Sequence, residues 1–138
     1  MTDRNRIAKK LAHIETYVQE LRDLAHPGEI QEDVRERRFV EHTLQIAVQA
    51  MLDVAAEILS SESGGKPGVD RGLIDFLEKN GWVQADLAAQ LREWVKLRNL
   101  LVYDYDDVDL DLLERIATDH LDGFLIFVQA IRQQLMPS

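Results

Sequence analysis

The residues most able to do chemistry lie within one short stretch, Leu97–Asp109. Arg98 is followed directly by Asn99; an apolar triplet intervenes, and Tyr103 and Tyr105 then alternate with aspartates. An arginine suits phosphate recognition because its planar guanidinium makes two parallel hydrogen bonds and stays charged at every relevant pH. A tyrosine can donate a hydrogen bond to phosphate or stack on a base. Most of the remaining sequence is typical of helical scaffold, so we expect any chemistry to lie here.

This stretch resembles the signature of the HepT-like branch of the HEPN superfamily, small all-helical ribonuclease toxins that pair with minimal nucleotidyltransferase antitoxins. The family pattern is Arg, four residues, His, one residue, Tyr, commonly with Asn after the Arg and Leu-Val before the His. Arg98, Asn99 and Tyr105 match this pattern, and Leu101–Val102 takes the Leu-Val positions. Tyr103 occupies the position of the histidine.

The resemblance implies a metal-independent RNA endonuclease that acts through the 2′-hydroxyl, with Arg98, Tyr103 and Asn99 at the catalytic positions. Such cleavage needs one group to take the 2′ proton and a cation to hold the phosphorane charge. Histidine suits the first role because its pKa lies near neutrality. A phenol, with a reference pKa of about 10, is only about one part in a thousand ionised at pH 7. We therefore expect this chain to bind like a HepT protein and to cleave RNA weakly or not at all.

The resemblance assigns a different role to Tyr105. In HepT-like systems the cognate nucleotidyltransferase neutralises the toxin by attaching AMP to the tyrosine two residues after the histidine, and Tyr105 matches that position. The modification would add phosphate charge and bulk beside Arg98 and so block the RNA site. The alternative is a tyrosine packed over a helix end with its hydroxyl in water.

The implied partners are a second copy of the chain in a homodimer, an MntA-like minimal nucleotidyltransferase antitoxin, and RNA as substrate. Two other functions remain open. The chain could be a non-catalytic helical binding partner of a nucleotidyltransferase, with the acidic tract at residues 103–122 and Arg98 as its docking surface. It could also be a structural dimer without a site.

Composition and charge set further bounds. With 138 residues, 46% of them hydrophobic and 30% charged, the chain suits a single soluble domain over residues 1–138. No run of about 18 apolar residues, no apolar leader segment and no cysteine is present, which favours a cytoplasmic protein without a membrane span. A net charge of −9 argues against strong sequence-independent binding to nucleic acid. The four histidines are scattered, so neither a metal site nor a cofactor is predicted.

Apolar residues recur at steps of three and four along most of the chain, and no alternating run indicates a strand. The predicted fold is all-α: an up-down antiparallel bundle of four long helices plus one short helix, HEPN-like in its resemblance. The predicted helices cover residues 3–25, 30–60, 70–79, a stretch from residue 84 into the signature, and 109–135.

Spacing adds a constraint on the site. Five residues of an ideal helix turn through about 500°, which leaves Arg98 and Tyr103 about 140° apart. The two side chains share a face only if the helix ends between them, or if a second chain completes the site. Because the resemblance implies dimers that bring two signatures into one cleft, we expect the second arrangement. We also expect the guanidinium of Arg98 beside the phenols of Tyr103 and Tyr105, in a pocket sized for a nucleotide phosphate.

Overall fold

The computed structural model describes residues 3–63 and 70–135, and these residues contain helices and turns but no strand. The predicted all-α fold is therefore confirmed. The elements in chain order are α1 (Arg4–Leu24), the 3-10 turn η1 (Pro27–Glu29), α2 (Val34–Ser63), α3 (Asp70–Lys79), α4 (Ala85–Tyr103), the 3-10 turn η2 (Tyr105–Asp107), α5 (Leu110–Asp119) and α6 (Asp122–Leu135).

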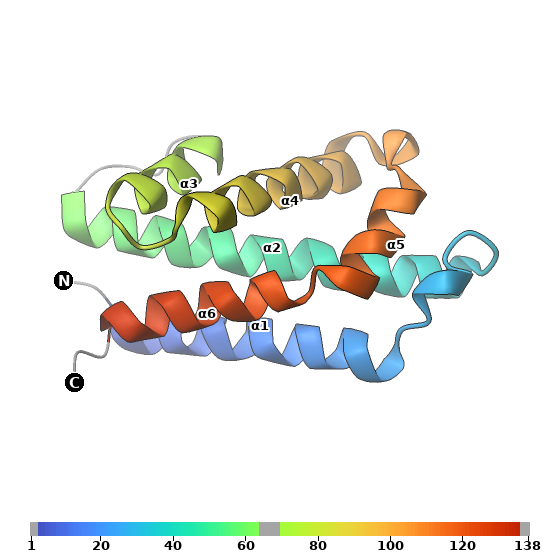
Figure 1. The fold of residues 1–138 in the computed structure, drawn as a ribbon, viewed down its shortest axis with the longest axis horizontal. Helices are drawn as coiled ribbons and strands as arrows, with labels where there is room; N and C mark the ends of the chain where they lie inside the picture. The colour runs from blue at the N-terminus through green and yellow to red at the C-terminus, as the bar shows by residue number, and fades with distance from the viewer. Residues whose placement is uncertain (1–2, 64–69, 136–138) are drawn as a thin grey trace.

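The longest helix, α2, lies in the middle of the fold and contacts α1, α3, α4 and α5. Helix α6 returns along α1, while α3 and α4 follow each other along the other side of α2 (Figure 1). Helix α5 crosses from the end of α4 to the start of α6 (Figure 1). The end of α4, which carries the signature, therefore lies at one end of the molecule beside the first half of α2.

Local sequence explains α1 well. Its buried residues recur at steps of three and four, as a stripe facing α2 and α6 requires. Asp3 caps the helix, because its side chain accepts a hydrogen bond from the backbone N–H of Arg6 at 3.1 Å. The buried stripe consists of Ile7, Leu11, Ile14, Val18 and Leu21.

Helix α2 begins at Val34, four residues later than predicted from Ile30. Ile30 is fully buried and follows η1 as part of a turn, so it serves the core without being helical. The side chain of Asp33 accepts hydrogen bonds from the backbone N–H groups of Arg35 and Glu36. This carboxylate caps the helix, which explains why the regular hydrogen bonding begins only after it.

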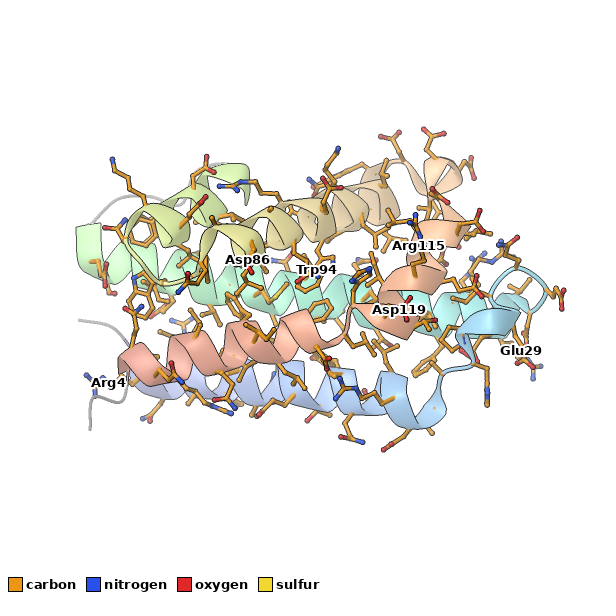
Figure 2. All side chains as sticks on the ribbon, in the orientation of Figure 1. Arg4, Glu29, Asp86, Trp94, Arg115 and Asp119 are labelled. Atoms are coloured by element: carbon orange, nitrogen blue, oxygen red, sulfur yellow. The ribbon has the colours of Figure 1, made fainter. Side chains whose placement is uncertain are left out.

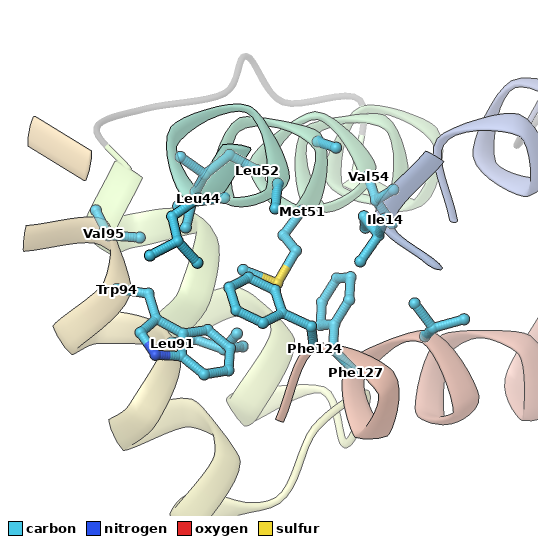
Figure 3. Packing of buried hydrophobic residues seen from close by; sticks show 14 of the residues in the cluster. Ile14, Leu44, Met51, Leu52, Val54, Leu91, Trp94, Val95, Phe124 and Phe127 are labelled. Atoms are coloured by element: carbon cyan, nitrogen blue, oxygen red, sulfur yellow. The ribbon is translucent and has the colours of Figure 1, made fainter. Parts of the chain in front are cut away.

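The last predicted helix is in fact two helices, because the chain bends at His120 and Leu121 between α5 and α6. The predicted cap at Asp109 is correct. The bend seats Gly123 against α4 so closely that a Cβ atom there would collide with the ring of Trp94. Trp94 in turn stacks on Phe124, with ring centroids 4.1 Å apart and planes within 2° (Figure 3). A continuous helix would not turn α6 back along α1 in this way.

The buried apolar side chains of all six α-helices form one cluster, in which Met51 of α2 meets Phe124 and Phe127 of α6 (Figure 3). Charged groups lie around the outside, whereas Trp94 lies between α4 and α6 (Figure 2). Burying an aliphatic or aromatic side chain of this kind contributes roughly 1.5–3 kcal/mol.

Helix α2 also has the length and composition of a membrane span. An 18-residue window within Val34–Glu62 has a mean hydropathy of 1.2, which is apolar enough for a membrane span. However, 56% of that window is buried inside the fold. The apolar character of α2 is explained by its contacts with α1, α3 and α4.

Candidate active site

The signature occupies the last turns of α4 and the start of η2. Helix α4 continues through Tyr103, and the backbone N–H of Asp104 still donates to the carbonyl of Leu100 at 2.9 Å. Arg98 and Tyr103 are therefore both helical, and their side chains leave the axis about 140° apart. The possibility that position 103 lies in a loop after the helix is excluded.

The side chain of Arg98 turns toward α2 and is half-buried. One terminal nitrogen donates to Oε1 of Gln49, and the other donates to Oδ1 of Asn99 at 2.6 Å. The amide nitrogen of Gln49 donates to Asp53 at 2.9 Å, and Lys10 of α1 donates to the same carboxylate at 3.2 Å. A polar network from three helices thus sets the direction of the guanidinium.

Tyr103 has the opposite environment. Three quarters of the residue, 75%, is exposed, and within residues 3–63 and 70–135 its ring and hydroxyl make no recorded hydrogen bond or ring contact. Its neighbour Val102 is also exposed. The end of α4 therefore presents an uncovered aromatic and aliphatic surface.

Tyr105 turns back toward the first half of α2. Its hydroxyl donates a hydrogen bond to Oε1 of Glu41 at 2.7 Å, and Arg38 donates to the same oxygen at 3.2 Å. The guanidinium carbon of Arg38 lies 4.9 Å from the centre of the Tyr105 ring, within the range of a cation–π contact. The residue remains 40% exposed. The alternative in which this hydroxyl simply faces water is therefore wrong.

Glu41 is the least exposed carboxylate-bearing residue at the site, with 4% of its surface accessible. Burial raises the pKa of its carboxyl group, and the nearby charges of Arg38 and Arg37 offset part of that rise. Neither Glu41 nor Gln49 is among the predicted site residues. No local signal singles them out, because α2 carries other polar residues around them, such as His42, Thr43 and Gln45.

The side chains of Arg98 and Tyr105 both contact α2, but at different positions along its axis. Their partners Gln49 and Glu41 are eight residues apart, which corresponds to about 12 Å along the axis of α2. The pocket that joins Arg98 to both phenols stays a prediction.

The acidic tract is largely structural or solvated. Asp109 caps α5 by accepting hydrogen bonds from two backbone N–H groups, and Asp111 accepts one from the side chain of Gln31 at 2.7 Å. The aspartates of η2 are exposed. Among the residues that the structure describes, no group of three or more histidine and acidic side chains could hold a metal ion.

A comparison with family models decides which family the chain belongs to. The model described as "Ribonuclease HepT-like" matches residues 10–131, which include the whole signature. The chain belongs to the HepT-like ribonuclease family. This HepT-like chain is 26% identical over 129 residues to the mRNA nuclease HepT of Shewanella oneidensis, covering 93% of this chain and 97% of that protein. It is 30% identical over 98 residues to the tRNA nuclease HepT of Aphanizomenon flos-aquae, covering 71% of this chain and 67% of that protein.

The fold of this HepT-like chain also matches a solved toxin. The tri-AMPylated HEPN toxin of Shewanella oneidensis, in complex with an MNT antitoxin, superposes with a TM-score of 0.85 at 26% identity. The match covers 96% of this chain and 98% of the toxin. The predicted family and the predicted HEPN-like fold are thereby confirmed.

Proposed function

We propose that this chain is the toxin of a HepT/MntA-type toxin–antitoxin pair, a metal-independent RNA endonuclease by family whose cleavage is weakened by Tyr103. The observation that carries the proposal is the position and orientation of Arg98. It stands at the arginine position of the signature in a HepT-like chain, and its guanidinium is directed by Gln49 and Asn99.

In this proposal Arg98 holds the charge that develops on the phosphate. A donor whose direction is already set by its neighbours stabilises a transition state without reorganising during the reaction. Asn99 supports it through the 2.6 Å hydrogen bond. Tyr103 is exposed at the end of α4, where it can stack on a base or donate to phosphate, but a phenol is a poor acceptor for the 2′ proton at neutral pH.

The proposed partners follow from the relatives. The Shewanella toxin was solved with its MNT antitoxin and carries three AMP groups. For this chain we propose a homodimer in the cytoplasm, an MntA-like nucleotidyltransferase as antitoxin, and Tyr105 as the residue that receives AMP. Since about 12 Å of helix separates the anchors of Tyr105 and Arg98, a chain of several nucleotides would block the RNA site more completely than one.

A second candidate is a non-catalytic partner of the nucleotidyltransferase. Tyr103 favours it, because the family histidine, whose pKa suits a general base near neutral pH, is missing at this position. The acidic, solvent-facing η2 would then contribute to docking.

The test is cleavage of total RNA by the purified chain and its Tyr103→His variant. Restoring a histidine is expected to raise the cleavage rate by about 100-fold, the usual contribution of a general base. The matched control, Tyr103→Phe, should remain as slow as the original chain. Adding Arg98→Ala to Tyr103→His should remove the gain. A folded Tyr103→His variant that leaves RNA intact would contradict the proposal and favour the non-catalytic partner.

A further inference from the structure

The hydroxyl of Tyr105 is held by a carboxylate that lies almost wholly inside the fold. Its hydrogen bond to Glu41 measures 2.7 Å, and the two residues are 64 positions apart in the sequence. Taking a carboxylate out of water is costly, even when hydrogen bonds offset part of the cost. Glu41 lies 4% exposed on the flank of the core helix α2, and its Oε1 is directed at a phenol that is itself 40% exposed. This places a buried acceptor beside the hydroxyl of a partly exposed tyrosine.

We propose that Glu41 is the proton acceptor for nucleotidylation of Tyr105 and that Arg38 keeps the pair aligned. The inference rests on the proposed function, in which Tyr105 receives AMP. A phenol is a weak nucleophile until a neighbouring base removes its proton, and a nucleophile within hydrogen-bond reach of an oriented base is the usual arrangement for that activation.

Nucleotidylation transfers AMP from ATP to the hydroxyl of Tyr105. Oη of Tyr105 attacks the α-phosphorus of ATP held by the nucleotidyltransferase, and the new Oη–P bond forms as the bond from that phosphorus to the oxygen bridging to the β-phosphate breaks. Pyrophosphate leaves with the electron pair of the broken bond. The phenolic proton passes to Oε1 of Glu41, which later releases it to water.

The surroundings of Glu41 suit this role. The charged and titratable groups that the structure records against it are Arg38 and Arg37 on α2 and Tyr105 on η2. Burial raises the pKa of the Glu41 carboxyl, which makes its ionised form a stronger proton acceptor. Arg38 donates to Oε1 at 3.2 Å and lies 4.9 Å from the centre of the phenol ring, so one guanidinium orients both partners.

A purely structural role makes a different prediction, because Glu41 would then only anchor η2 to α2. The substitution Glu41→Gln separates the two roles, since glutamine keeps an acceptor oxygen and nearly the same shape but loses the basic carboxylate. Glu41→Asp restores a carboxylate on a shorter side chain. Glu36→Gln is the matched control, because Glu36 is also buried on α2, and the structure records no bond from it to Tyr105.

The experiment follows AMP attachment by intact mass. The full chain is incubated with an MntA-like nucleotidyltransferase, ATP and Mg²⁺. Glu41→Gln is expected to slow the initial rate of AMP attachment by about 100-fold. Glu41→Asp should recover part of this rate. Glu36→Gln should be modified at the rate of the original chain. The rate for the original chain should rise with pH as Glu41 ionises and then level off, and Glu41→Gln should lose this dependence.

Two outcomes overturn the inference at different levels. If Tyr105→Phe abolishes AMP attachment while Glu41→Gln is modified at the original rate and with the original pH profile, Glu41 is only an anchor and the proposed function stands. If the original chain receives no AMP at Tyr105, the proposed regulation fails and the inference fails with it.

Discussion

At the scale of single residues, the two tyrosines that follow Arg98 differ in their exposure and in their hydrogen bonding. Tyr103 is exposed and stands on α4, whereas Tyr105 hydrogen-bonds to Glu41 beneath the guanidinium of Arg38. A residue that must meet RNA or a second chain has to be uncovered. A residue that must lose a proton benefits from a nearby base. The placement of the two tyrosines fits this division of roles.

A residue-scale prediction concerns the ion pair between α1 and α6. Arg132 donates two hydrogen bonds to Glu15, at 2.7 and 2.8 Å, and this contact lowers the pKa of Glu15 below its ordinary value of 4.5. A lowered pKa in the folded state means that the contribution to stability is present at neutral pH and is lost as the pH falls through that lowered pKa. Both side chains are about two fifths exposed, so solvent screening limits the contribution to under about 1 kcal/mol.

Glu15→Gln should therefore reduce the free energy of unfolding by that small amount at pH 7, and the difference from the original chain should shrink as the pH falls below the ordinary pKa of 4.5. Urea unfolding at pH 7 and at a pH below 4.5 measures this difference. Glu20→Gln, on an exposed part of the same helix, serves as the control and should have no effect. An equal loss for Glu15→Gln at both pH values would show that the ion pair is not the cause.

At the scale of elements, α2 organises the site as well as the core. It holds Arg98 through Gln49 and Tyr105 through Glu41, so the last turns of α4 and the whole of η2 are positioned by one rigid neighbour. The second element that depends on close packing is α6, which passes α4 at Gly123.

An element-scale prediction follows from that crossing. Gly123→Ala should lower the free energy of unfolding by about 1–3 kcal/mol, because the added methyl group collides with Trp94 and Gln90, and Trp94 is held by stacking on Phe124. Gly72→Ala in α3 is the matched control: a Cβ atom there meets nothing within 4 Å. It should instead stabilise the protein by about 0.5–1 kcal/mol through helix propensity. Thermal and urea unfolding test both, and a neutral Gly123→Ala would contradict the packing argument.

At the scale of the whole molecule, the proposed site calls for a second chain. Arg98 faces α2 while Tyr103 leaves α4 about 140° away around the helix, so we propose that a second copy completes the site. We therefore predict a homodimer joined across the exposed end of α4. Light scattering during gel filtration should give twice the chain mass of 15.9 kDa.

Substitution locates the predicted interface. Val102→Asp places a charge beside Tyr103 and should produce monomers, since an unpaired charge is costly in a contact surface. Ile126→Asp is the control, because Ile126 is a similarly exposed apolar residue on α6. It should leave the dimer intact. Dissociation by Ile126→Asp alone would place the interface at α6 and not at the end of α4.

The sequence by itself determined the helices, most of their ends and the residues of the signature. Periodic apolar residues, caps such as Asp3 and Asp109, and the motif around Arg98 are local patterns, so they can be read from neighbouring residues. Glu41 and Gln49 do not stand out in the same way, because α2 carries several other polar residues beside them.

Only the tertiary structure decided which of these residues meet. The bend between α5 and α6, the fit of Gly123 against Trp94 and the bond from Tyr105 to Glu41 depend on how distant helix faces pack. The apolar spacing after Asp109 favours a continuous helix. The chain instead breaks the helix at His120 and Leu121, among weak helix formers such as Asp119 and Gly123. Contacts between residues far apart in sequence are set by the relative placement of whole helices, which no short window of sequence contains.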